Sequence, residues 1–185
     1  MMRAAWGSLV LALVVAAAVA AQQHGAAARS DAALIKSAMT AAPPAIAKDA
    51  TIVDVSAEGK VRSVRKGTNN FSCMADNPHT PGPDPMCGDQ NAMEWVDAWI
   101  NKREPPQNKV GFMYMLAGGT DASNTDPHAQ KPTANDNWIK TGPHVMVVGA
   151  KGMMEGYPRD PNPETSKPYV MWAGTPYEHL MLPVR

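Results

Sequence analysis

The stretch "GPHVMVVG", residues 142–149, is an apolar run of β-branched and methionine side chains bounded by glycine and proline. A bounded apolar run of about four to eight residues predicts a buried β-strand. Three further stretches have the same form: "VGFMYMLAGG" (110–119), "KPYVMWAG" (167–174) and "EHLMLPV" (178–184). The C-terminal half therefore predicts four buried strands.

The N-terminal half predicts a β-hairpin and one more strand. The β-branched runs "ATIVDVS" (50–56) and "KVRSVRKG" (60–67) are joined by "AEG", which places Gly59 in the turn. The stretch "NNFSCMA" (69–75) follows and predicts a third, short strand.

Two segments carry helical periodicity. In "DQNAMEWVDAWINKR" (89–103) apolar residues recur every three or four positions, Asp89 can cap the N-terminus, and Pro105 and Pro106 stop the helix. A shorter helix is predicted for "SDAALIKSAM" (30–39), with Ser30 as its cap and Pro43 and Pro44 beyond its end.

These elements predict an α+β fold, with a mainly antiparallel sheet of about six or seven strands, one or two helices and one disulfide. The first 21 residues have the basic start, apolar core and small-residue end of a secretory signal peptide, with cleavage expected after Ala20 or Ala21. The expected organisation is a signal peptide (1–21), an N-terminal segment with a short helix (22–49) and a single α+β domain (50–185).

The signal peptide predicts an exported protein, either periplasmic or secreted. No second apolar run approaches the roughly 20 residues that span a bilayer, so we expect no stable membrane span in the mature protein. The chain has 17 basic and 17 acidic residues, and this balance gives no bulk attraction for nucleic acid.

The only cysteines, Cys73 and Cys87, enclose the proline-rich segment "MADNPHTPGPDPM". In an exported protein a disulfide is the expected state of such a pair. The prolines exclude helix and central strand, so the cross-link would hold this segment against the domain. The spacing fits no redox motif, haem attachment or zinc site.

A polar stretch of some 20 residues without periodicity, "GGTDASNTDPHAQKPTANDN" (118–137), is the candidate functional loop. Its chemistry-bearing side chains are Asp121, Asn124, Asp126 and His128. Counted from Asp121, the stretch lacks the glycine and glutamate that a calcium-binding helix-loop-helix requires at positions six and twelve. The alternative is a series of side-chain-stabilised turns that binds nothing.

The string His-x-Met occurs twice, as His144 with Met146 and as His179 with Met181. Residues two apart in a strand share a face, so each pair would present an imidazole beside a thioether. If the two strands are neighbours, the four side chains form a candidate metal site, and their softness points to copper, especially Cu(I). The alternative is core packing, since methionine is a common filler of buried strands.

Five strings together resemble a family of exported bacterial proteins that has no assigned activity. They are "GTNNFSCM", "DPMCGDQNAMEW", "GFMYMLAGGTDASNTDP", "TGPHVMVVG" and "GTPYEHLMLPV", and the resemblance runs from about Gly67 to the C-terminus. It implies export and supplies no catalytic residues.

No serine-nucleophile elbow, zinc-protease pair, phosphate loop or dinucleotide fingerprint occurs in the sequence. Whether the protein is an enzyme, such as a small hydrolase, is therefore left open. The sequence favours a non-catalytic binding or interaction module of the cell envelope, whose partner would be an envelope protein or a small ligand. A copper-binding protein is the alternative.

Overall fold

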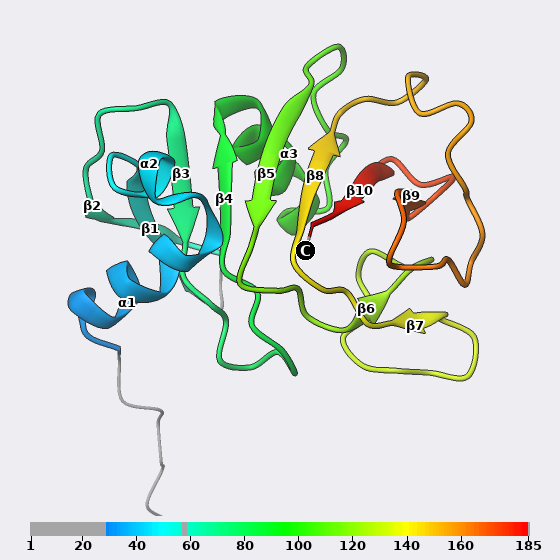
Figure 1. Cartoon of the computed structure of the whole chain (residues 1–185), viewed down its shortest axis with the longest axis horizontal. Coiled ribbons are helices and arrows are strands. Elements are labelled where there is room, and N and C mark those ends of the chain that lie inside the picture. The colour runs from blue at the N-terminus through cyan, green and yellow to red at the C-terminus, as the bar shows by residue number, and fades with distance from the viewer. Residues whose placement is uncertain (1–28, 57–58, 185) are drawn as a thin grey trace, which may run out of the picture.

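The computed structural model describes residues 29–56 and 59–184. Its main feature is a sheet of eight strands in the order β2-β1-β3-β4-β5-β8-β10-β9 (Figure 1). β1 and β3 are parallel, and every other neighbouring pair is antiparallel. The predicted α+β class with a mainly antiparallel sheet is confirmed, while the strand count is higher than predicted. The predicted signal peptide lies outside the described residues.

The strands of the large sheet are β1 (Thr51–Val55), β2 (Val61–Arg65), β3 (Phe71–Met74), β4 (Met86–Asp89), β5 (Gly111–Met115), β8 (His144–Val148), β9 (Tyr169–Met171) and β10 (His179–Pro183). Seven of them were predicted, including the β1–β2 hairpin with Gly59 at φ 77° in its turn. The polar loop contains β6 (Ala122–Ser123), which pairs with β7 (Trp138–Ile139) in a second sheet of two strands.

β4 is the strand of the large sheet that the sequence did not predict. The prolines at 78–85 do avoid regular strand, but the segment re-enters the sheet at Met86 and lies centrally between β3 and β5. Cys73 and Cys87 face each other across β3 and β4, and they form the predicted disulfide. Both sulfurs belong to fully buried residues, so the cross-link lies inside the core.

Both predicted helices are present. α1 (Asp31–Ala38) is capped by the hydroxyl of Ser30, which accepts from the Ala33 amide, and α3 (Gln90–Ile100) is capped in the same way by Asp89. A 3₁₀ turn η1 (Met39–Ala41) follows α1. The prolines then begin a further short helix, α2 (Pro44–Ala47), with Pro44 in the first turn, where proline's missing N–H is tolerated.

The helices lie on opposite faces of the sheet (Figure 1). α1 and α2 cover β1 and β3 and enclose a core around Ile52 and the disulfide. α3 covers the other face and encloses the largest core, which includes Trp95, Met113 and Val148. We call this side the α3 face.

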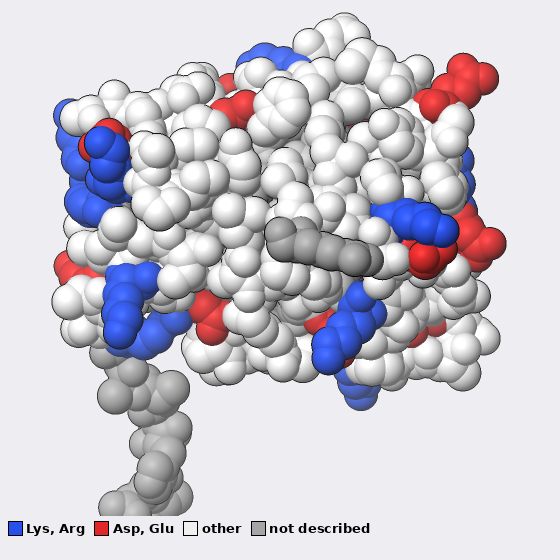
Figure 2. Space-filling model, in the orientation of Figure 1, with Lys and Arg blue, Asp and Glu red and all other residues white. Residues whose placement is uncertain are grey.

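The charged side chains visible in Figure 2 lie mainly around the margin of the molecule, with both signs interspersed. Within the described residues, no helix combines the length and the apolar character that crossing a bilayer requires.

Candidate functional site

The two His-x-Met strings lie on neighbouring strands. β8 and β10 pair antiparallel, with Met146 directly opposite Met181. Both methionines belong to the core of the α3 face, and alternation along each strand places His144 and His179 on that same face. The adjacency that the copper hypothesis requires is therefore present.

The register separates the two histidines, however. His144 lies opposite Pro183 and His179 lies opposite Met171, so the methionine pair stands between them. Four residues along a strand correspond to about 13 Å. The described part of the chain contains no group of three or more His, Cys, Asp or Glu residues that could hold a metal ion. Any metal here would depend on single histidines combined with methionines.

His179 lies in an aromatic cluster. Its ring meets Trp95 and Trp172 edge-on, with centroids 5.3 and 4.9 Å away, and its exposed fraction is 1%. Nδ1 lies 3.0 Å from the carbonyl oxygen of Tyr177. Burial lowers the pKa of His179 to about 4, so the ring is neutral at physiological pH.

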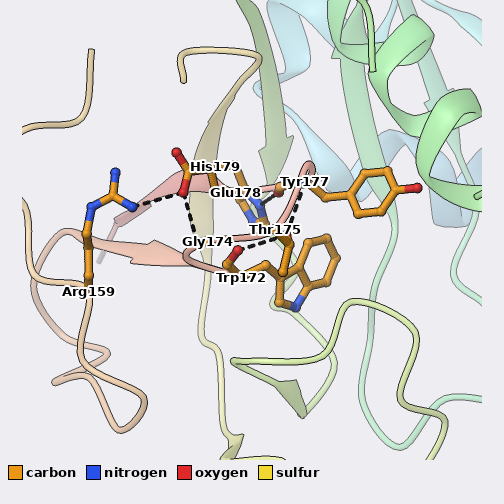
Figure 3. Close-up of polar contacts among 7 residues, drawn as sticks. All are labelled: Arg159, Trp172, Gly174, Thr175, Tyr177, Glu178 and His179. Carbon is orange, nitrogen blue, oxygen red and sulfur yellow. Dashed lines mark hydrogen bonds and ion pairs between the residues drawn. The ribbon is translucent and has the colours of Figure 1, made fainter. Parts of the chain in front are cut away.

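The turn before β10 fixes this histidine (Figure 3). Trp172 adopts a left-handed backbone with φ 54°, and its carbonyl accepts from the amide and hydroxyl of Thr175. The buried carboxylate of Glu178 accepts from Arg159 at 2.9 Å and from the Gly174 amide at 3.0 Å. Burial opposes the charge of Glu178, but these two bonds prevail and lower its pKa. The carboxylate thus serves the turn rather than proton transfer.

His144 has a different environment, at the start of β8. Its exposed fraction is 3%, and burial lowers its pKa although the bond from Nδ1 to the Gly142 carbonyl, 2.6 Å long, opposes the shift. The ring lines a pit of about 10 Å³ together with Thr141, Tyr169 and Met181. The hydroxyl of Tyr169 is buried and has no hydrogen-bond partner among the described residues.

Several polar side chains of the candidate loop 118–137 form hydrogen bonds with other groups of the protein. Buried Asn124 donates to the carbonyls of Asp160 and Pro161, and Asp126 accepts from the amide of His128 in an Asx turn. The His128 ring packs edge-on against Tyr177, while Asp121 is half-buried. These contacts of the loop residues fit the alternative interpretation, a series of side-chain-stabilised turns. The four candidate side chains do not converge on one point.

The proline-rich disulfide loop is organised by Asp84. Its carboxylate accepts from the Asn77 amide at 2.8 Å and from the Thr80 hydroxyl at 2.9 Å. A side chain on Gly82 would approach the carbonyl of Gly119 to 3.3 Å, so this loop lies against the start of the polar loop. The proline-rich loop and the polar loop thus adjoin at one end of the sheet.

A larger concavity lies elsewhere, between α3 and the β1–β3 end of the sheet. This groove, which we call the α3 groove, has a volume of about 500 Å³ and is lined by Thr51, Asn69, Asn70, Phe71, Ser72, Gln90, Met93, Glu94 and Asp97. No lysine or arginine of the described chain is among its lining residues. Five of its nine lining residues carry a hydroxyl or an amide, two carry a carboxylate, and Phe71 and Met93 are apolar.

Sequence reasoning missed this groove because its residues come from three separate segments and form no motif. The available signal was the polar stripe of α3, where Gln90, Glu94 and Asp97 share one face, but such a stripe is usual for any solvated helix. Comparison with protein-family models, with curated proteins and with solved structures finds no match for this chain. The geometry of the described residues is therefore the basis on which we infer a function.

Proposed function

We propose that the protein is an exported, non-catalytic binding module that takes a neutral, hydroxyl-rich small ligand, such as a short saccharide, in the α3 groove. The single observation that carries this proposal is the groove itself. Its volume of about 500 Å³ falls within the range of small-molecule sites. Export is supported by the signal-like N-terminus and by the buried Cys73–Cys87 disulfide, which fits an oxidising compartment.

The chemistry of the lining favours a neutral ligand. Asn69 and Thr51 serve the fold, because Asn69 donates to Ile46 and Thr51 accepts from Gly67. The side chains of Asn70 and Ser72 make no hydrogen bond within the described structure, so both are free to pair with a ligand. Amides and hydroxyls donate and accept equally well, which suits the alcohol groups of a sugar.

The carboxylates at the groove are held in ion pairs. Glu94 lies 2.5 Å from Lys109, and this hydrogen bond lowers the pKa of Glu94. Asp97 forms an ion pair with Arg103. A hydrolytic acid would require a raised pKa, so the observed environment supports binding rather than acid–base catalysis.

The proposal predicts which residues respond to a ligand. In an amide-resolved NMR titration of the purified protein with neutral oligosaccharides, signals from 69–72 and 90–97 should shift. Gln90→Ala should weaken binding by about 10-fold, because one to two hydrogen bonds are lost.

Gln130→Ala is the matched control, since Gln130 is an exposed glutamine of the polar loop. It should leave the affinity unchanged. Shifts confined to 118–137, or an equal loss in both variants, would move the binding site from the groove to the polar loop. Shifts in the groove caused by uncharged peptides but by no saccharide would refute the ligand class.

A further inference from the structure

The pit beside His144 is a second concavity, separate from the α3 groove. Its lining includes the exposed residues Gly142 and Pro143, and its volume of about 10 Å³ is room for one atom-sized occupant. The side chains that carry its chemistry are His144, Met181 and Tyr169. They come from β8, β10 and β9, which are three neighbouring segments of the sheet.

The ring of His144 is held in a fixed orientation. Its Nδ1 lies 2.6 Å from the carbonyl of Gly142 and donates to it, which leaves the lone pair on Nε2. Nε2 makes no hydrogen bond to any described residue. Histidines that bind metals usually donate their other ring nitrogen to a carbonyl in this way. A β-carbon on Gly119 would lie 2.8 Å from Cε1 of His144, so the backbone there holds the ring closely.

The neighbouring side chains add a soft donor and an unpaired hydroxyl. Met181 is 2% exposed and faces Tyr169 across the β9–β10 ladder. Tyr169 is also 2% exposed, and its hydroxyl lacks any partner in the described structure. Leaving a buried hydroxyl unpaired costs about 1 to 3 kcal/mol, so an occupant of the pit that pairs with it would be favoured.

We propose that this pit binds Cu(I), with Nε2 of His144 and the thioether sulfur of Met181 as ligands and the hydroxyl of Tyr169 beside the ion. Imidazole and thioether are the soft donors that Cu(I) prefers. No carboxylate of the described chain lines the pit, so a divalent cation would find no compensating charge there. A univalent soft cation fits this neutral donor set best. His179 and Met146 take no part.

The test is an anaerobic competition between the purified protein and a chromophoric Cu(I) chelator. The wild-type protein should withdraw copper from the chelator. Removing a ligand should weaken binding at least as much as the roughly 10- to 100-fold loss that follows removal of a supporting residue. We therefore expect such a loss for His144→Gln and for Met181→Leu.

Two matched variants separate the pit from unspecific effects. Met154→Leu makes the same change at a buried methionine in a different core, and His179→Gln removes a buried histidine that has the same carbonyl bond but does not line the pit. Both should retain wild-type affinity. Leucine nearly conserves the volume of methionine, so both methionine variants should fold, which near-ultraviolet circular dichroism would verify.

Failure of the wild-type protein to withdraw copper would overturn the proposal. An equal loss for His179→Gln and His144→Gln would also overturn it, because the ligands would then include the aromatic cluster. Neither result bears on the α3 groove, whose saccharide titration needs no metal.

Discussion

His179 shows how one side chain can tie stability to pH. Its ordinary pKa of 6.5 applies in the unfolded chain, while burial in the folded protein lowers the pKa to about 4. Between pH 6.5 and about pH 4 the unfolded chain binds a proton at His179 that the folded protein does not bind. The stability that depends on neutral His179 is therefore fully present above pH 6.5 and is lost as the pH drops toward 4. His144 contributes in the same direction.

We expect acidification from about pH 7 to about pH 4.5 to cost the metal-free wild type about 2 to 3 kcal/mol through His179 alone. Urea unfolding of the wild type and of His179→Gln at both pH values measures this loss. On acidification, the free energy of unfolding of the variant should fall by about 2 to 3 kcal/mol less than that of the wild type. His79→Gln, which changes an exposed histidine, is the control. Parallel pH profiles for wild type and His179→Gln would contradict the assignment.

At the scale of elements, the docking of α3 on the sheet depends on a glycine. A β-carbon on Gly111, at the start of β5, would lie 2.3 Å from the backbone nitrogen of Ala92. Backbone cannot move aside as a flexible side chain can. The helix and strand therefore approach more closely than any other residue would allow, and this contact fixes one wall of the α3 groove.

Gly111→Ala should destabilise the protein by about 1 to 3 kcal/mol, because α3 must shift away from β5. Gly142→Ala is the matched control: a β-carbon there meets nothing within 4 Å, and its cost should stay within about 0.5 kcal/mol. Chemical denaturation of both variants provides the measurement. Equal stabilities would show that α3 tolerates displacement, and the groove would then lack a rigid wall.

The same elements show what sequence patterns can predict. Seven strands of the large sheet could be predicted from apolar and β-branched runs. Two helices could be predicted from apolar periodicity and from the caps Ser30 and Asp89. β4 did not, because its residues Met86, Cys87 and Gly88 follow a proline-rich run and carry no alternation of their own. Its place is set by partners on both sides, which is tertiary information that a local pattern lacks.

The candidate sites divide along the same line. The sequence predicted that the His and Met of each string share a face, but it left open whether the two strands are neighbours. It could not predict the register, which separates His144 from His179. The pit and the α3 groove join residues distant in the chain. The sequence did not indicate a role for Tyr169, because only a three-dimensional structure shows that its buried hydroxyl has no partner among the described residues.

For the whole molecule, the disulfide is the main covalent constraint. It closes a loop of sequence separation 14 and joins β3 to β4 in the middle of the sheet, within the core that α1 and α2 cover. Closing a loop of this length stabilises a protein by about 3 kcal/mol through the unfolded chain. Its loss should therefore lower the stability of the entire fold.

We expect the double variant Cys73→Ala, Cys87→Ala to be less stable than the oxidised wild type by at least about 3 kcal/mol. Guanidinium unfolding with and without a thiol reductant checks this, since the reductant should weaken the wild type and leave the variant unchanged. A wild-type midpoint that the reductant does not move, with free thiols confirmed, would contradict the expectation.

The stacked indoles of the α3 face have an optical consequence. The ring centroid of Trp95 lies 6.2 Å from that of Trp99 and 6.2 Å from that of Trp172, and the centroids of Trp99 and Trp172 are 5.2 Å apart. At these distances the three indole chromophores couple electronically. Trp172 follows β9, whereas Trp95 and Trp99 belong to α3. Their coupling therefore reports whether α3 is in contact with the sheet. The protein therefore carries an intrinsic spectroscopic reporter of its own largest core, and no added label is needed to follow it.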